Sequence, residues 1–148
     1  MRRFTLLILF LTSALPLWPQ TLPDGNRDNE LFATVGLMLD DLIMLYGTPQ
    51  SVHTARGEEF WQDDVVFVYS DGDFYIYHDR VWQVGLRSAY NIQIGDTRSV
   101  ALLVFGERGQ DNGDFILYPL AGNNWPLVLR VNINEERVSG IYVFRPDF

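Results

Sequence analysis

The fold is decided by residues 35–47, VGLMLDDLIMLYG, because a closely similar stretch follows 59 residues later as residues 94–106, IGDTRSVALLVFG. Both glycines recur at this spacing, and the apolar positions between them match in kind. Self-similarity at a fixed period is typical of a repeated structural unit. We therefore expect two copies of one small α+β unit, an architecture that favours binding over chemistry.

Each copy is expected to open with a small helix-loop-helix. In the first copy, Asp40 and Asp41 lie in the first turn of a helix, where carboxylates suit the positive end of the helix dipole. Apolar residues follow at helical spacing, and Gly47 ends the helix. A shorter helical turn is expected before it, within residues 31–35. The predicted fold is α+β, with two tandem helix-loop-helix units packed on one face of an antiparallel β-sheet.

The rest of each copy is expected to form antiparallel strands joined by tight turns. Runs of β-branched and aromatic residues between Asp-Gly or Asn-rich segments are typical of hairpins. The expected strands are residues 65–69, 74–78 and 81–87, with a weaker one at 50–56, and residues 115–120, 125–133 and 138–145. The expected turns are residues 70–73, 79–80, 122–124 and 134–136.

Matched apolar positions of the two copies are expected to form the core beneath the helices. They are Phe74, Ile76, Val81, Val84, Leu86, Val131, Ile133, Val138, Ile141 and Val143. Successive side chains on a strand point to opposite faces. The other face should therefore carry Tyr75, Tyr77, Gln83, Arg87, Arg130, Asn132, Tyr142 and Phe144.

Aromatic rings mixed with arginine and amides are the composition of an interface rather than of a core. The candidate protein-binding residues are therefore Tyr75, Tyr77, Arg87, Arg130, Tyr142 and Phe144.

The aromatic density is highest between Phe60 and Trp82. Two interpretations are open. In one, half of these rings fill the core and the rest pack on one another as cross-strand pairs. In the other, the rings outside the core form a platform for a protein or a ligand. Trp125, beside Pro126 at a loop edge, is a weaker candidate of the same kind.

The first residues have the features of a secretory signal peptide. A short basic start precedes an almost unbroken apolar run from Phe4 to Leu17, and residues 12–14 near the end of this run supply small side chains for cleavage. The run is shorter than the roughly 20 residues that a transmembrane helix needs. We expect a signal peptide at 1–20, a flexible leader at 21–30 and one domain at 31–148, with repeats at 31–87 and 88–148. An uncleaved membrane anchor is the alternative.

The composition limits the classes of partner and chemistry. The chain has no cysteine, which excludes disulfides, thiol catalysis, cysteine-ligated metals and a lipid-bearing N-terminal cysteine. The formal net charge is −8, and loss of Arg2 and Arg3 with the signal would make it more negative. An acidic surface repels nucleic acid and anionic lipid headgroups. We therefore expect a periplasmic or secreted protein that is not a lipoprotein, has no stable membrane span after signal removal and binds no nucleic acid.

Residues 36–49, GLMLDDLIMLYGTP, resemble the glycine-start, glycine-proline-end helix motif of SmpA/OmlA-type envelope proteins and of the β-lactamase-inhibitor-protein fold. The doubled arrangement is similar to the inhibitor proteins, which contain two such units in tandem. The resemblance implies two helix-loop-helix elements behind one curved antiparallel sheet. It also implies a secreted or periplasmic protein that grips another protein with the open face of that sheet.

No cluster of residues predicts catalysis or a metal site. His78-Asp79 lies at a tight turn, where Asp is ordinary, and His53 lies in a different segment. The acidic groups at 63–64 and 71–73 and the segment 111–114 lack the twelve-residue loop with a closing glutamate that calcium sites use. No nucleophile elbow or zinc-protease motif occurs. We therefore expect no cofactor, no metal and no enzyme activity.

The sequence thus predicts a non-catalytic binding protein that engages another envelope or secreted protein through the helix-free face of its sheet. One alternative is an assembly or structural factor that docks by its helices or termini. Another is a small-ligand or lipid binder with a cavity between helices and sheet. A homodimer that covers the aromatic face is also possible.

Overall fold

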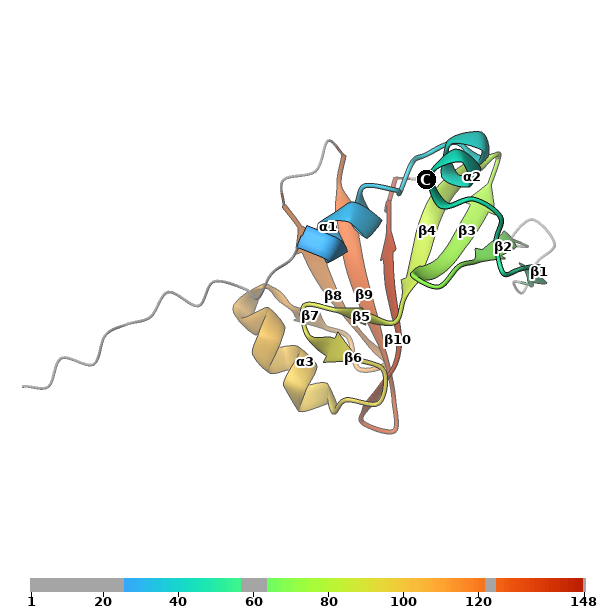
Figure 1. Ribbon diagram of the computed structural model, residues 1–148. Helices are drawn as coiled ribbons and strands as arrows, with labels where there is room; N and C mark the ends of the chain where they lie inside the picture. The colour runs from blue at the N-terminus through green and yellow to red at the C-terminus, as the bar shows by residue number, and fades with distance from the viewer. Residues whose placement is uncertain (1–25, 57–63, 122–124, 148) are drawn as a thin grey trace, which may run out of the picture.

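The computed structural model describes residues 26–56, 64–121 and 125–147. The expected signal peptide, the aromatic residues Phe60 and Trp61 and the expected turn at 122–124 lie outside these ranges. One large antiparallel sheet dominates the part of the chain that is described, and short helices lie against one of its faces (Figure 1).

The helices are α1 (Asn26–Phe32), α2 (Leu39–Tyr46) and α3 (Arg98–Phe105), followed by the short 3₁₀ turn η2 (Gly106–Arg108). The strands of the first half are β1 (Ser51–Ala55), β2 (Asp64–Val68), β3 (Gly72–Tyr77) and β4 (Arg80–Leu86). A small hairpin follows, β5 (Ser88–Ala89) and β6 (Ile92–Gln93). The second half contains β7 (Gln110–Asp111), β8 (Phe115–Leu120), β9 (Leu127–Asn134) and β10 (Arg137–Phe144).

The large sheet has eight strands in the order β1-β2-β3-β4-β10-β9-β8-β7, and every neighbouring pair is antiparallel. The two halves meet where β4 pairs with β10, from Gln83↔Phe144 to Leu86↔Ile141. The four strands of each half are consecutive in the chain, so each half is a meander and the β4–β10 pair is the junction between them. Single-layer sheets of this size need cover on at least one face to bury apolar surface.

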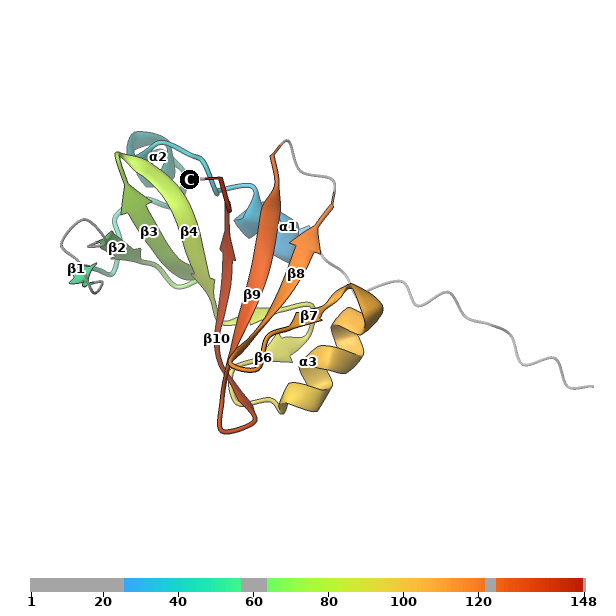
Figure 2. The ribbon, with the colours of Figure 1, turned by 180° about the vertical axis from the view of Figure 1, so that it is seen from behind.

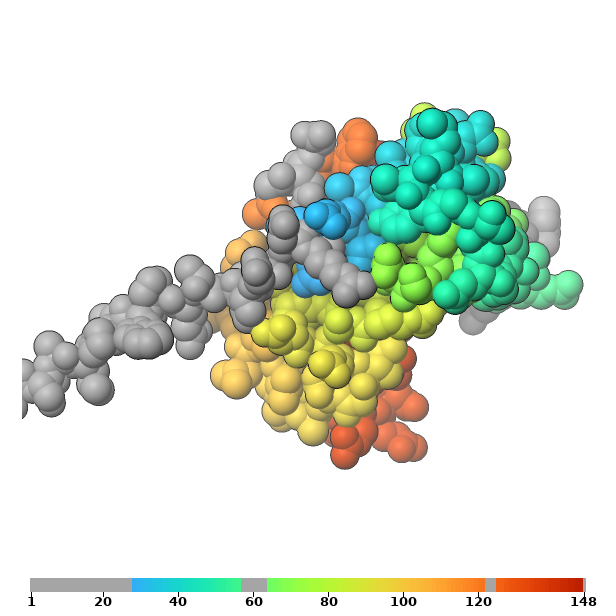
Figure 3. All heavy atoms as spheres, in the orientation of Figure 1, coloured from blue at the N-terminus to red at the C-terminus, as the bar shows by residue number. Residues whose placement is uncertain are grey.

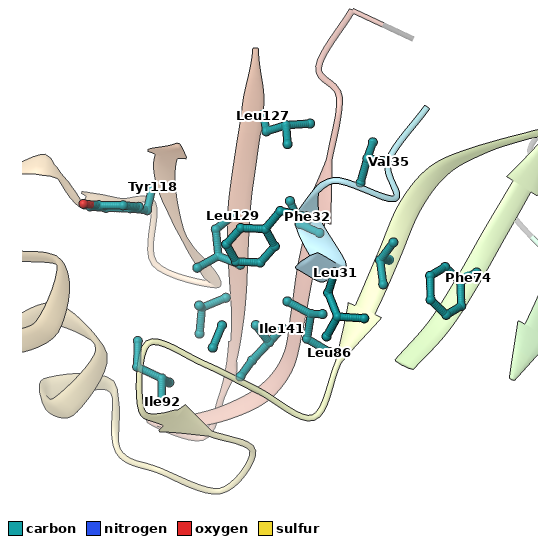
Figure 4. Packing of buried hydrophobic residues seen from close by; sticks show 14 of the residues in the cluster. Leu31, Phe32, Val35, Phe74, Leu86, Ile92, Tyr118, Leu127, Leu129 and Ile141 are labelled. Atoms are coloured by element: carbon teal, nitrogen blue, oxygen red, sulfur yellow. The ribbon is translucent and has the colours of Figure 1, made fainter. Parts of the chain in front are cut away.

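The core lies between this sheet and α1, α2, α3 and the β5–β6 hairpin (Figures 1 and 4). All ten matched apolar positions predicted for the core are buried there, which confirms the face assignment of these strands. Phe32 of α1 is buried and lies near Leu129 of β9, while Leu31 lies near Leu86 of β4 (Figure 4). Helix α1 therefore packs across the junction and contacts both halves of the sheet.

The predicted fold of two helix-loop-helix units is wrong. The described chain is mainly an eight-stranded sheet with few short helices, and only the first half has two helices. In the second half the β5–β6 hairpin stands before α3, because Tyr90 and Asn91 form a two-residue turn with φ of 49° and 63°. Asn tolerates this left-handed backbone well, and such turns join strands, not helical turns.

Around α2 and α3, however, the backbone of the two halves follows one pattern. Gly36 and Gly95 have φ of 100° and 96°, a region that L side chains rarely adopt. The N–H of each glycine donates to the last strand of its half, in β4 to the carbonyl of Val81 at 2.7 Å and in β10 to the carbonyl of Val138 at 2.8 Å. The glycine thus turns the chain into the helix while pinning the helix start to the sheet.

The boundaries of several elements can also be compared with the prediction. Helix α1 begins at Asn26, inside the segment predicted to be a flexible leader. The weak strand predicted near 50–56 is present as β1 and pairs with β2 along its whole length. The turns predicted at 79–80 and 134–136 are two-residue turns at 78–79 and 135–136, with positive φ at both residues of each.

Candidate functional site

Figure 2 shows the sheet from its helix-free face, called here the tyrosine face. The strand register assigns to this face the side chains opposite to the core. Its rows follow from the strand register. One row runs Val66, Tyr75, Gln83, Phe144, Val128 and Pro119, the next Val68, Asp73, Gly85, Tyr142, Arg130 and Leu117, and the third Gly140, Asn132 and Phe115. The face crosses the β4–β10 junction, so both halves contribute to it.

Two tyrosines form the centre of this face. The rings of Tyr75 and Tyr142 lie edge to face with their centroids 6.3 Å apart, a geometry that aromatic pairs favour. Both rings lie over Gly85: a Cβ on that glycine would be 3.5 Å from the Tyr75 ring and 3.6 Å from the Tyr142 ring. The Tyr142 ring also covers Gly140, where a Cβ would come within 2.7 Å of it. The two glycines leave the room in which the Tyr142 ring lies flat along the sheet.

The Tyr75 phenol is held in its neutral form. Burial raises its pKa to about 12, and the neighbouring Tyr142 and the charges of Asp73 and Asp64 add to the shift. Tyr75 is half-buried although none of the described helices lies on this face. The pair is thus a packed aromatic surface with low side-chain freedom, which lowers the entropy lost when a partner binds.

Arginines frame the tyrosine pair on two sides. The Arg130 guanidinium lies 4.3 Å from the centroid of the Phe115 ring and donates to Asn132 Oδ1 at 2.7 Å. Arg87 pairs with Asp73 at 2.8 Å at the exposed edge of the face. Each guanidinium is thus oriented by an acceptor and retains further N–H donors for a ligand.

The remaining candidates lie at the rim. The Tyr77 side chain is 39% exposed and stacks on His78, with ring centroids 4.0 Å apart. Phe144 is half-buried opposite Gln83 and Val128. The six predicted binding residues therefore share one face, with Tyr75, Arg130 and Tyr142 near its centre and Tyr77 and Arg87 at its margin.

Sequence reasoning missed two members of the site. Phe115 lies opposite Asn132 and supplies the ring beneath Arg130. Because it alternates with the core residues Ile116 and Tyr118 on the same strand, alternation could have placed it on the tyrosine face. Trp82 donates from Nε1 to Asp64 Oδ1 at 3.0 Å. It is the extra residue of a β-bulge between the Tyr75↔Gln83 and Ile76↔Val81 pairs, which simple alternation does not predict.

The polar motifs have structural roles in this arrangement. His78 and Asp79 are the two turn residues between β3 and β4, with φ of 47° and 58°. Asp111 pairs with Arg98 and accepts the Gly113 N–H at 3.0 Å, so the acidic segment 111–114 is tied to α3. Among the described residues no group of three or more His, Asp or Glu is placed to hold a metal ion.

No protein-family model and no curated protein sequence matches the chain. Solved structures similar to it include an extracellular protein containing an SCP domain from Bacillus anthracis str. Ames and a cysteine-rich secretory protein from Staphylococcus aureus. The first is 11% identical with a TM-score of 0.47 over 79% of this chain and 46% of that one. The second is 10% identical with a TM-score of 0.43 over 78% and 46%.

The chain thus spans less than half of either similar protein. Within the described ranges, no helix has the length and hydropathy required to cross a bilayer. The assignment of function therefore rests on the residues of this chain.

Proposed function

We propose that this is an exported, non-catalytic binding protein that engages another envelope or secreted protein through the tyrosine face. The observation that carries the proposal is the Tyr75–Tyr142 pair, packed over Gly85 at the junction of the two halves. Tyrosine rings give large contact area for few rotatable bonds, and oriented arginines add directional hydrogen bonds. Export rests on the N-terminal sequence, a basic start followed by a short apolar run.

The packing of the core supports protein binding over a ligand held between helices and sheet. The core side chains that α1, the β5–β6 hairpin and the sheet contribute to this layer, among them Phe32, Ile92 and Leu129, are essentially inaccessible to solvent. No buried side-chain nitrogen or oxygen in the described residues lacks a hydrogen-bond partner. A lipid site would need an unfilled apolar cavity in this layer.

Docking by the helices is the second candidate, and one observation favours it. Met44 of α2 is 85% exposed and Leu103 of α3 is 83% exposed, at matched positions of the two similar stretches. These side chains lie on the other side of the sheet from Tyr75 and Tyr142. The two candidates are therefore separable by variants that leave the core untouched.

The test is affinity capture from envelope extract with three forms of the mature protein. They are the unchanged protein, a Tyr75→Ala/Tyr142→Ala variant and a matched Met44→Ala/Leu103→Ala control. We expect a protein retained by the unchanged and control forms and lost from the tyrosine variant, with all three folded by circular dichroism. Loss from the helix control alone would instead assign docking to α2 and α3, and a complex containing only this chain would indicate a homodimer.

A further inference from the structure

The two arginines of the tyrosine face differ in what compensates their charge. Arg87 forms an ion pair with Asp73 at 2.8 Å. Arg130 instead donates from Nε to the neutral side-chain amide of Asn132, at 2.7 Å from Oδ1. None of the ion pairs between described residues involves Arg130. Its positive charge therefore has no anionic partner in the described part of the chain, although the protein has 19 acidic and 11 basic residues.

The strand neighbours of Arg130 are uncharged. Its cross-strand partners are Tyr142 on β10 and Leu117 on β8. The acidic member of the same row, Asp73, lies on β3, three strands from β9 in the sheet. With adjacent strands about 4.8 Å apart, this separation is roughly 14 Å. Water and salt largely screen exposed charges over such a distance. Asp73 therefore leaves the charge of Arg130 uncompensated.

The Arg130 side chain is nevertheless held in a defined orientation. Its guanidinium lies 4.3 Å from the centroid of the Phe115 ring, and the bond from Nε to Asn132 fixes its rotation above that ring. All three side chains are half-buried. A guanidinium also carries N–H donors on its two terminal nitrogens. Among the described residues no acceptor is placed for these nitrogens, so they are available to a ligand.

A carboxylate is the anion that this geometry fits best. The two terminal nitrogens form a planar fork, and its N–H groups match both oxygens of a carboxylate. The uncharged side chains of Tyr142, Leu117 and Phe115 beside the fork would limit the access of water to such a pair, which strengthens it. Phosphate groups, in contrast, are recognised by clusters of arginine. The other arginine of this face is already paired with Asp73.

We propose that the partner protein presents a carboxylate to the tyrosine face, bound end-on by the two terminal nitrogens of Arg130. The inference rests on the proposed function and adds the chemistry of the partner's contact at this point. Charge complementarity supports it, because the bound carboxylate supplies the anion that Arg130 lacks in the described chain. An acidic side chain and the C-terminal carboxylate of a polypeptide share this chemistry, so the experiment has a probe for each source.

The probes are three short peptides. Acetyl-Ala-Glu-Ala-amide carries a side-chain carboxylate, acetyl-Ala-Ala-Ala with a free C-terminus carries a terminal one, and acetyl-Ala-Gln-Ala-amide is the uncharged control. Each is titrated into the ¹⁵N-labelled mature protein while the Nε–H resonance of Arg130 and the amides of β8, β9 and β10 are followed. We expect saturable shifts, with a dissociation constant on the order of 1 mM for the preferred carboxylate peptide and at least about tenfold weaker binding of the glutamine peptide.

Asn132→Asp is the most informative variant. It keeps the size of the side chain and the acceptor for Nε, but it places a carboxylate beside Arg130. The internal ion pair should weaken binding of the carboxylate peptides about tenfold or more. The matched control is Asn91→Asp, which adds the same charge in the turn of the β5–β6 hairpin. This hairpin, in yellow in Figure 3, lies on the opposite side of the sheet, so the control should leave binding unchanged.

Variants of the arginine test the fork itself. Arg130→Gln removes the charge and should abolish saturable binding. Arg130→Lys keeps the charge without the planar fork and should weaken binding. Arg108→Gln is the control, because Arg108 also stacks on a ring, 4.9 Å from the centroid of Tyr118, but on the helix side of the sheet. It should leave binding unchanged. The amide spectrum of each variant shows whether it is folded.

The proposal would be overturned by the absence of saturation with both carboxylate peptides, or by equal affinity for the glutamine peptide. Undiminished binding by Asn132→Asp, Arg130→Gln or Arg130→Lys would also overturn it, as would equal weakening by Asn91→Asp or Arg108→Gln. If capture of a partner still depended on the tyrosine pair, the proposed function would stand without this contact. Tighter binding of the peptide with a free C-terminus assigns a terminal carboxylate, and tighter binding of the glutamate peptide assigns an acidic side chain.

Discussion

The two halves of the molecule start their helices in the same way and finish the surrounding structure differently. Gly36 and Gly95 turn the chain with nearly equal φ, and the Arg80 and Arg137 side chains donate to their carbonyls at 3.1 and 2.8 Å. In the first half, α1 precedes α2 in the chain, whereas in the second half the β5–β6 hairpin precedes α3. The shared part is the scaffold, and the differing parts provide the binding surfaces.

The differences fall at the sites inferred above. On the tyrosine face, Tyr142 lies flat because the neighbouring strand of the first half has glycine at position 85. At the helix ends, the second half stacks Arg108 on Tyr118, whereas the first half packs Tyr46 against Tyr69 and Phe74. Divergence between similar halves therefore marks the residues that are free to serve binding.

The largest effect on stability is expected in α1, which has no counterpart in the second half. Phe32→Ala in α1 removes a buried ring that packs across the junction, and it should lower the free energy of unfolding by about 3–5 kcal/mol. Urea denaturation measures this difference. Met44→Ala, at an exposed position of α2, is the control and should change stability by less than about 0.5 kcal/mol. Equal effects would show that α1 does not hold the two halves together.

Alanine substitution of the glycines that precede α2 and α3 should lower stability by a smaller amount, and by different amounts in the two halves. Alanine at Gly95 must adopt φ near 96° with open space around its Cβ, a strain of about 1–3 kcal/mol. Alanine at Gly36 meets the same strain and brings a Cβ to 3.1 Å from the Trp125 ring. We therefore expect Gly36→Ala to be the more destabilising of the two in thermal unfolding. The reverse order would contradict the described packing of Trp125.

The arginine bonds to the glycine carbonyls should contribute less again. Arg80→Met and Arg137→Met each remove one exposed hydrogen bond while keeping most of the aliphatic stem. A loss of about 0.5–1.5 kcal/mol is expected for each from urea denaturation. A loss at one arginine and none at the other would show that the two helix starts are not energetically equivalent.

The smallest expected effect is on pH dependence. As pH falls, the helix of the second half, α3, should lose local stability and α2 should not. Hydrogen bonds from Arg98 and from the Gly113 N–H lower the pKa of Asp111. In α2 the position matched to Arg98 is occupied by Leu39, which cannot make such a bond. A carboxyl with a depressed folded pKa stabilises the protein above its unfolded pKa, near 3.8, and this stabilisation is lost as pH falls through the folded pKa. Amide exchange of α3 should accelerate in that window and that of α2 should not, and Asp111→Asn should abolish the difference.

Much of the sheet could be predicted from the sequence, because alternation of side chains fixes which face is buried once one face is apolar. The ten matched core positions follow this rule, and all are buried. The β5–β6 hairpin was not predicted, because the matched glycines indicated a second helix-loop-helix. The pair Tyr90-Asn91 instead forms a two-residue strand turn with positive φ. The start of α1 at Asn26 was missed because its stability comes from Leu31 and Phe32 packing on distant strands.

The site was only partly accessible to sequence reasoning. Alternation selected Tyr75 and Tyr142, but their contact depends on the pairing of β4 with β10, which are far apart in the chain. The bulge at Trp82 and the ring of Phe115 beneath Arg130 likewise depend on register between strands.

The central claim is that the tyrosine face binds a partner protein, and capture with opposed variants tests it most directly. The account predicts one exported protein retained by the unchanged form and by Met44→Ala/Leu103→Ala, and lost with Tyr75→Ala/Tyr142→Ala. The Tyr75→Phe/Tyr142→Phe variant, which keeps both rings, should retain most of that protein. Undiminished capture by a folded Tyr75→Ala/Tyr142→Ala variant would contradict the claim.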